Sequence, residues 1–218
     1  MNKTFRLIWN AAAGCWNVAS ELVRSKGKTK ARTIGTIAAG LLTSGAALAE
    51  LPTGGQIIAG SGSINQNGNT LTVTQDTQRM AANWNSFSIG QNNTVEFIQP
   101  SSSSVALNRV TGIEASILQG NMNANGHVIL VNPNGIHITN TAQINVGGII
   151  ASTLDITTED FMAGNYSFSG MSPGQIINQG NIQTPDGGTV AFIAAKITNT
   201  GTIHTPRGNT LMGAGSQV

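Results

Sequence analysis

Short runs in which apolar and polar side chains alternate fill the chain after residue 50. Leu71 and Val73 alternate with threonines, and Val95 and Phe97 flank Glu96. No stretch in this part keeps the 3.6-residue apolar period of a helix for three turns. A two-residue period places every second side chain on the same face of an extended strand. The pattern therefore predicts short strands of roughly three to six residues, with further examples at 128–131, 136–138 and 144–146.

Turn-forming sequences separate these runs at regular intervals. The sharpest is Asn132-Pro133-Asn134-Gly135, which stands between the runs 128–131 and 136–138. A tight turn is expected here, because proline presets the backbone of a turn and the Asn-Gly pair tolerates a positive φ. Similar turn signals occur at 66–69, 92–93, 125–126, 147–148, 185–188 and 207–209.

A repeat in the C-terminal part indicates how the strands are arranged. Residues 176–190 match residues 197–211 at an offset of 21, with Ile, Asn, Gly, Ile, Thr, Pro, Gly and Thr kept in place. A period near 20 with several short strands per repeat is typical of a parallel β-helix, in which each coil buries its apolar side chains by stacking on the next. Asparagines at equivalent positions would form amide ladders between coils. A jelly roll or a β-sandwich is the alternative, but neither requires a matched repeat.

The first 49 residues have the layout of a long secretion signal. A basic segment at 26–32 precedes an uncharged stretch of 17 residues that ends at Ala49. Ala47 and Ala49 are small residues at the −3 and −1 positions of a signal peptidase site, which predicts cleavage before Glu50. A transmembrane anchor is the alternative, although a stretch of this length rich in Gly, Thr and Ser is at the short limit for a membrane span.

The basic charge of the chain belongs to this leader. The sequence pI is about 9.0, but seven of the 11 Lys and Arg residues precede residue 50. The remainder has four cations against eight carboxylates, a net charge of −4. Four scattered cations form no stripe that could follow a phosphate backbone, so nucleic acid is not expected as a partner.

The part after the leader has few groups suited to catalysis or metal binding. The single cysteine, Cys15, lies in the leader, which excludes an internal disulfide and a thiolate metal site after cleavage. The three histidines lack a paired ligand spacing, so no metal, no cofactor and no catalytic residue is expected. Three acidic residues at 155–160 precede Phe161. A solvated loop is expected there, with a paired carboxylate as the alternative.

Several motifs, in order along the chain, resemble those of a known family of exported proteins. The segment 1–22 resembles the extended signal-peptide region of large Gram-negative exoproteins. The segment 83–90, with Trp84 and Phe87, resembles their W-x-x-F-x-I-G element. Taken together, the ordered set resembles the N-terminal secretion domain of filamentous-haemagglutinin-like proteins, the exported partner in two-partner secretion. Further matches are 95–100, Asn108-Arg109-Val110, 131–136 and 151–154.

The resemblance implies a fold, a division into domains and a route of export. The expected fold is all-β, a right-handed parallel β-helix of about 20–21 residues per coil with an N-terminal β cap. Residues 1–25 would extend the signal, 26–49 would form the Sec signal proper, and 50–218 would form the two-partner secretion domain. Expected partners are the Sec machinery, signal peptidase and a cognate outer-membrane β-barrel transporter whose POTRA domains recognise the domain. The product would be a secreted, adhesin-type virulence protein that reaches the cell surface through the periplasm.

The resemblance also implies which residues matter for export. The motif at 132–135 is expected to be a fold-nucleating turn whose loss abolishes secretion, with direct transporter contact as the alternative. Trp84 and Phe87 are expected to pack in the core and cap, with a recognition patch as the alternative. The residues expected to act in transporter recognition or fold nucleation are Asn132, Pro133, Asn134, Gly135, Ile136, Trp84, Phe87, Asn108 and Arg109.

Two other functions stay open at the level of the sequence. Parallel β-helices also carry polysaccharide-active enzymes, which need clustered acids and a cationic base on one face, whereas the four cations here are dispersed. Contact-dependent inhibition toxins share this N-terminus, but their toxic domain lies far downstream. Contact with a host or bacterial cell-surface receptor is likewise expected from a downstream region, because family members are commonly much longer.

Overall fold

The computed structural model describes residues 5–10, 15–20 and 51–215, in two separate units, Met1–Ser44 and Gly45–Val218. In the first unit, β1 (Phe5–Asn10) pairs antiparallel with β2 (Cys15–Ser20). The predicted Sec signal at 26–49 and the predicted cleavage residues Ala47, Ala49 and Glu50 lie outside the described residues.

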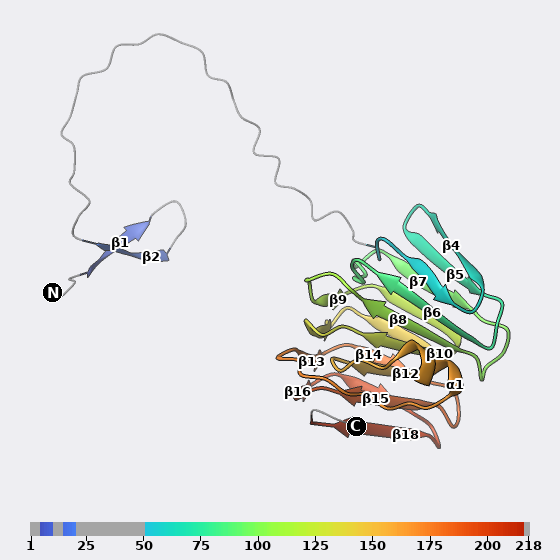
Figure 1. Cartoon of the computed structure of the whole chain (residues 1–218). Helices are drawn as coiled ribbons and strands as arrows, with labels where there is room; N and C mark the ends of the chain where they lie inside the picture. The colour runs from blue at the N-terminus through green and yellow to red at the C-terminus, as the bar shows by residue number, and fades with distance from the viewer. Residues whose placement is uncertain (1–4, 11–14, 21–50, 216–218) are drawn as a thin grey trace, which may run out of the picture. The chain divides into compact units, whose positions relative to one another are not determined.

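The second unit is a stack of coils in which the chain returns to the same faces turn after turn (Figure 1). The strands within each face are parallel, which confirms the predicted parallel β-helix. The first face contains β5 (Thr70–Gln75), β7 (Thr94–Ile98), the first half of β10 (Asn121–Val131), the first half of β12 (Gln143–Ser152), β14 (Asn181–Gln183) and β17 (Thr202–His204). The second contains β6 (Arg79–Trp84), β8 (Val105–Val110), the second halves of β10 and β12, β15 (Thr189–Ile193) and β18 (Asn209–Gly213). The third contains β9 (Ser116–Leu118), β11 (Ile136–Ile138), β13 (Gln175–Asn178) and β16 (Lys196–Asn199).

An antiparallel cap begins the β-helix, as predicted. Strand β3 (Gln56–Ala59) pairs antiparallel with β6, and β4 (Gly62–Asn67) pairs antiparallel with β5. The cap gives β5 and β6 hydrogen-bonding partners on the side away from the coils. Without such partners, these strands would have open edges that invite pairing with other chains.

The core is a set of apolar ladders that run through the coils. The alternating pattern places Leu71, Val95, Met122, Ile144 and Ile182 in one register, each directly above the next. Each of these five side chains is at most 3% exposed. Since neighbouring strands are about 4.8 Å apart, the stacked side chains are in van der Waals contact. The predicted 21-residue repeat is one coil, because β13 pairs with β16 and Ile176 stands opposite Ile197.

The predicted amide ladders are present where asparagines share a register. Nδ2 of Asn178 donates to Oδ1 of Asn199 at 2.8 Å, across one coil spacing. Nδ2 of Asn145 donates to Oδ1 of Asn123 at 3.4 Å on the first face. These bonds satisfy side-chain amides between coils, so the polar positions contribute to stacking as well as the apolar ones.

Two strands are longer than the predicted three to six residues, since β10 has 11 residues and β12 has 10. The turn signals at 125–126 and 147–148 lie inside these strands, so the prediction of a turn at each was wrong. Ala124 pairs with Val146 whereas His127 pairs with Gly148, so β10 has one more residue than β12 between the two pairs. Such a bulge bends a strand around a corner while the flanking residues stay paired.

One segment leaves the coils between β12 and β13, and we call residues 153–174 the strap. It contains α1 (Thr158–Ala163), where a solvated acidic loop was predicted; that prediction was wrong. Thr157 caps the helix, since its hydroxyl oxygen accepts a hydrogen bond from the backbone N–H of Asp160 at 3.0 Å. Phe161 is fully buried beneath the helix. A helix of six residues is too short to show an apolar period over three turns, which is why the pattern missed it.

Candidate functional site

The motif Asn132-Pro133-Asn134-Gly135 forms the predicted tight turn at the corner between β10 and β11. The backbone N–H of Gly135 donates to the carbonyl of Asn132 at 3.1 Å. Gly135 has a φ of 114°, a conformation that other residues rarely adopt. Ile136 follows directly and begins β11, where it stacks between Ser116 and Ile176.

The side chain of Asn132 ties this turn to the preceding coil. Asn132 is fully buried, and its Nδ2 donates to the carbonyl of Glu114 at 3.0 Å and to Oγ of Ser116 at 2.9 Å. Its Oδ1 accepts from the backbone N–H of Asn134 at 2.9 Å. The backbone N–H of Asn132 donates to the carbonyl of Ser152 in the following coil at 2.9 Å. One residue therefore connects three successive coils.

At the same corner, contacts between neighbouring coils line up in a series that we call the corner column. Nδ2 of Asn134 donates to the carbonyl of Gly112 at 2.9 Å. Gly112 in turn lies so close to the preceding coil that a Cβ atom there would be 2.1 Å from the carbonyl oxygen of Asn85. On the other side, the hydroxyl of Ser172 donates to the carbonyl of Pro133. The column links the W-x-x-F-x-I-G segment to the turn and to the end of the strap.

We expect the Gly112→Ala substitution to lower the free energy of unfolding by about 1–3 kcal/mol, because the added methyl group forces the Asn85 corner apart. Guanidinium denaturation of the purified protein measures this change. The control is Gly68→Asn in the β4–β5 turn, where φ is 56° and no atom lies within 4 Å of an added Cβ. Asparagine tolerates that conformation, so the control is expected to change stability by less than about 0.5 kcal/mol. Equal effects of the two substitutions would contradict the prediction.

Trp84, Phe87 and Asn108 form one buried cluster close to the N-terminal cap. The rings of Trp84 and Phe87 meet edge to face, with centroids 5.4 Å apart and an interplanar angle of 88°. Nε1–H of Trp84 donates to Oδ1 of Asn108 at 3.0 Å. Nδ2 of Asn108 donates to the carbonyls of Ala106 at 3.3 Å and Ile129 at 3.4 Å. The cluster joins β6, β8 and β10 through the interior.

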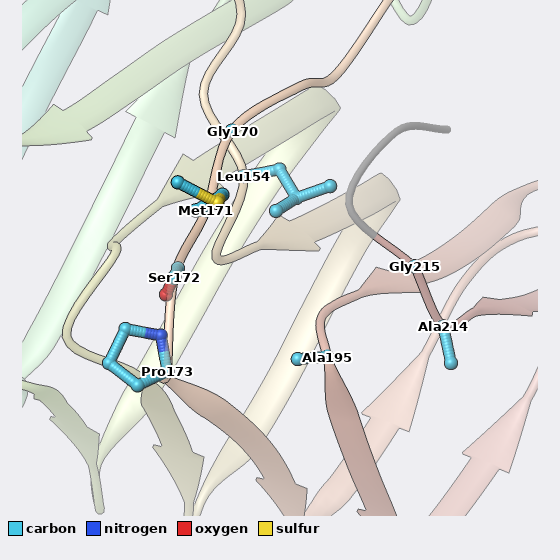
Figure 2. A pocket seen from close by; sticks show the side chains of 8 residues that line it. All are labelled: Leu154, Gly170, Met171, Ser172, Pro173, Ala195, Ala214 and Gly215. Atoms are coloured by element: carbon cyan, nitrogen blue, oxygen red, sulfur yellow. The ribbon is translucent and has the colours of Figure 1, made fainter.

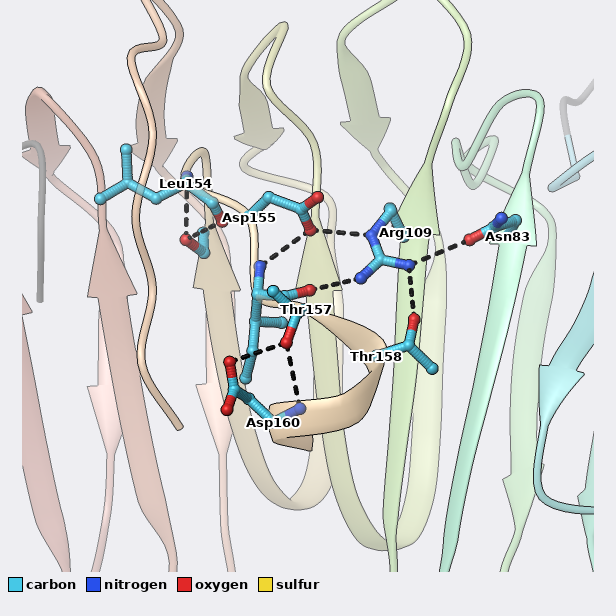
Figure 3. Close-up of polar contacts among 9 residues, drawn as sticks. Asn83, Arg109, Leu154, Asp155, Thr157, Thr158 and Asp160 are labelled. Carbon is cyan, nitrogen blue, oxygen red and sulfur yellow. Dashed lines mark hydrogen bonds and ion pairs between the residues drawn. The ribbon is translucent and has the colours of Figure 1, made fainter. Parts of the chain in front are cut away.

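Arg109 lies on the outer side of β8 and binds the strap (Figure 3). Its Nε pairs with Oδ1 of Asp155 at 2.8 Å. Its Nη1 donates to Oδ1 of Asn83 and to Oγ1 of Thr158, both at 3.3 Å, and its Nη2 donates to the carbonyl of Ile156. Because the Asp155 side chain is 53% exposed, the ion pair is screened and worth at most about 1 kcal/mol.

The expected export residues are therefore arranged in three places. Trp84, Phe87 and Asn108 are together inside the β-helix, the motif at 132–135 with Ile136 is at the corner, and Arg109 is on the outer face. Among them, the side chains that are at most 1% exposed are those of Trp84, Phe87, Asn108, Asn132 and Ile136. Only Pro133 and Asn134 of the turn are exposed.

A second corner was not anticipated from the sequence. The side chain of Gln99 is buried, and its Oε1 accepts from the backbone N–H of Gly126 at 2.9 Å. Its Nε2 donates to Oε1 of Gln75 at 3.0 Å in the preceding coil. Nδ2 of Asn125 donates to the carbonyl of Gln99 at 2.8 Å. The available signal was the recurrence of an amide residue, Gln75, Gln99 and Asn125, at this corner of successive coils.

Two hollows lie along the strap. One of about 520 Å³ is lined by the strap residues Leu154 and 170–173 and by Ala195, Ala214 and Gly215 (Figure 2). None of these lining residues is ionisable. The other, of about 240 Å³, is lined by His127 and Tyr166, by Ser103 and Thr189, and by apolar residues of the second face. Among residues 5–10, 15–20 and 51–215, no group of three or more His, Cys, Asp or Glu could hold a metal ion. No helix within those ranges is long and apolar enough to cross a membrane.

Burial lowers the pKa of His127 below its ordinary value of 6.5. As the pH falls below 6.5, His127 is therefore protonated to a greater extent in the unfolded chain than in the folded one. The contribution of His127 to stability is fully present above pH 6.5 and is lost as the pH falls through the lowered pKa of the folded state. We expect denaturation midpoints of His127→Gln to fall less than those of the unsubstituted protein between about pH 7.5 and about pH 5.5. His204→Gln, at an exposed position on β17, controls for the loss of an imidazole. A parallel fall of the midpoints in all three proteins would contradict the prediction.

Comparison with known proteins agrees with this architecture. The TPS secretion domain family matches residues 48–218, and the family described as extended signal peptide of type V secretion system matches residues 1–50. A heme/hemopexin-binding protein of Haemophilus influenzae is 43% identical over 136 residues, which cover 61% of this chain and 15% of that protein. A second Haemophilus influenzae protein of the same description is 43% identical over 99 residues, or 45% of this chain and 11% of that protein.

Among solved structures, the HMW1 secretion domain from Haemophilus influenzae superposes with a TM-score of 0.69 at 32% identity, covering 76% of this chain and 45% of that one. The chain spans less than half the length of these relatives. Such a domain and signal imply Sec export, passage through the periplasm to the cell surface, and a cognate outer-membrane transporter. The parallel β-helix, its antiparallel cap and the matched signal region agree: the chain belongs to the TPS secretion domain family and is the N-terminal secretion module of a two-partner secretion exoprotein.

Proposed function

We propose that residues 50–218 form a non-enzymatic module that nucleates the β-helix at the cell surface after passage through the transporter. In this proposal residues 1–25 tune inner-membrane targeting, and residues 26–49 form the Sec signal that is removed before Glu50. The observation that carries the proposal is the corner column, in which the buried amide of Asn132 bonds one coil through its side chain and another through its backbone. A turn bonded in this way stabilises several coils at once, so its formation favours further stacking.

The burial of the expected export residues suggests when the transporter would recognise them. Trp84 and Phe87 are 1% exposed and Asn132 is not exposed in the folded domain. We propose that the POTRA domains of the transporter bind this segment before its coils close, while these side chains are accessible. Folding would then remove the recognised groups from the transporter and release the chain. Pairing with an extended strand is a common mode of recognition for an unfolded segment.

The composition supports passage of an unfolded chain. No cysteine follows Cys15, so disulfides cannot close loops in the oxidising periplasm. Two of the four cations after the leader pair with aspartates, Arg109 with Asp155 and Arg207 with Asp186. Both arginines are thus engaged in ion pairs, which supports a non-enzymatic role for the module.

We propose that ligand or receptor binding by a full-length protein resides downstream of this module. The relatives that share the domain have different descriptions, a heme/hemopexin-binding protein and HMW1. Because the shared part is the secretion domain, the differences between them are expected to arise elsewhere. Contact with a host or bacterial cell-surface receptor is part of the same proposal.

The central test is secretion of the full chain with and without its cognate transporter. We expect the chain in the medium only when the transporter is present, and we expect the Asn132→Ala, Asn134→Ala double variant to accumulate in the periplasm. Binding to the purified full-length transporter in detergent tests the timing: the urea-unfolded chain is expected to bind after dilution, and the folded chain is not. Secretion that ignores the transporter or the double substitution would overturn the proposal.

A further inference from the structure

A second apolar cluster lies outside the coils, between the strap and the outer side of the second face. Phe161 is fully buried in it and Phe168 is 2% exposed. It is distinct from the main core inside the β-helix. The strap contributes Leu154, Ile156, Phe161 and Phe168, and the sheet contributes Ala81, Leu107, Ile129, Val131 and Ile193.

The strap crosses strands from the beginning of the β-helix to its later coils. Arg109 on β8 bonds its first half. A Cβ atom on Gly164, at the end of α1, would lie 2.7 Å from Nη2 of Arg79 on β6. The backbone N–H of Thr153 donates to the carbonyl of Ile193 on β15 at 2.9 Å. One segment of the chain thus contacts strands that are separated by several coils.

The order of these contacts along the chain sets the order in which they can form. The strands β6, β8, β10 and β12 all precede the strap in the chain, whereas β15, which supplies Ile193, follows it. Until the strap closes, Leu107, Ile129 and Val131 are apolar side chains on an uncovered face. Closure buries them together with two phenylalanines, and the removal of this apolar surface from water stabilises the closed strap.

We propose that the strap is a latch that closes over coils already formed and slows their unfolding, so that exported coils do not return into the transporter. This inference rests on the proposed function, in which coils fold outside the cell as the chain emerges. A latch that closes after the folding transition state changes the unfolding rate and leaves the folding rate unchanged. Arg109 is a positioning residue in this device, because it orients the start of α1 against β8.

The test uses the full chain, secreted through its transporter and purified from the medium. Phe168→Ala removes an anchor of the strap and Asp155→Asn removes the ion pair with Arg109. Met162→Ala, at an exposed position on α1 within the same strap, is the matched control. We expect Phe168→Ala to raise the unfolding rate in guanidinium at least about tenfold while the refolding rate changes less than about twofold. Secretion is expected to fall several-fold, with a smaller effect in Asp155→Asn and none in Met162→Ala.

Three outcomes would overturn the latch. A fall in the refolding rate equal to the rise in the unfolding rate would place the strap in the folding nucleus, and an unchanged unfolding rate would show that it is not a latch. Normal secretion of Phe168→Ala, with faster unfolding, would show that the latch is not used in export. If Phe168→Ala yields too little protein, the same rates in Phe168→Leu decide, since this change removes less of the buried side chain. The proposed function fails on a separate result, namely normal secretion of the Asn132→Ala, Asn134→Ala double variant or secretion without the transporter.

Discussion

Replacing Asn132 by alanine is expected to lower the free energy of unfolding by about 3 kcal/mol and to reduce the secreted amount at least about tenfold. The substitution removes both donors that bond the carbonyl of Glu114 and Oγ of Ser116. Ser116 is fully buried, so its hydroxyl loses a partner that water cannot replace. The acceptor for the backbone N–H of Asn134 is lost as well, which loosens the turn itself.

Two further variants separate the parts of this effect. Asn132→Asp keeps an oxygen that accepts from Asn134 but places a buried oxygen opposite the Glu114 carbonyl, so it is expected to lose at least as much stability as alanine. A loss smaller than that of alanine would assign the effect to the turn. Asn69→Ala, at an exposed position in the β4–β5 turn, is the control and is expected to change stability by less than about 0.5 kcal/mol. Guanidinium denaturation and the amount of protein in the medium are the measurements. Full secretion of Asn132→Ala with a change below about 1 kcal/mol would exclude a nucleating turn.

The Trp84→Ala substitution is expected to destabilise the folded domain by about 3–5 kcal/mol. It removes the largest buried ring, its edge-to-face contact with Phe87 and the hydrogen bond to Oδ1 of Asn108. Because Trp84 joins β6 to β8 next to the cap, the first coils are expected to lose protection from amide hydrogen exchange before the later ones. Denaturation and residue-resolved exchange measure the two effects.

Trp84→Phe separates the ring from the hydrogen bond. It keeps most of the apolar volume and removes the Nε1–H donor, so a loss of about 1–3 kcal/mol is expected from the unpaired Asn108 amide. Combined with Asn108→Leu in a double-mutant cycle, it measures the coupling between the two side chains. A coupling energy near zero would show that the bond between Trp84 and Asn108 contributes nothing to the cap.

The coil itself could be predicted from local patterns. Leu71, Val95 and Ile144 follow a two-residue period, and that period alone assigns them to the inner face of a strand. The 21-residue offset equals the observed register of Ile176 and Ile197, because identical coils stack with equivalent residues in line. The corners at 125–126 and 147–148 could not be predicted correctly, since Asn-Gly and Gly-Gly pairs suit both a turn and a bulge inside a paired strand.

The residues of the site could be named from the sequence, but the side chains and backbone groups that they contact could not. The family resemblance pointed to Asn132, Asn108 and Arg109, but their contacts lie far away in the sequence. Asn132 bonds Ser116 at a separation of 16 residues, and Arg109 bonds Asp155 at a separation of 46. Such separations are set by how many coils intervene and by where the strap leaves the stack, and neither is a local property.

What the sequence by itself determined is the repeating coil, because short strands with an apolar position every second residue and a matched repeat at an offset of 21 residues bury their apolar side chains when the coils stack. What only the tertiary structure decided is the strap and the face beneath it. Leu107 and Ile129 point away from the main core, and an outward apolar residue on a strand has no predictable partner. They are buried because Arg109 and two phenylalanines hold α1 and the rest of the strap against them. The six residues of α1 are too few to be recognised by periodicity.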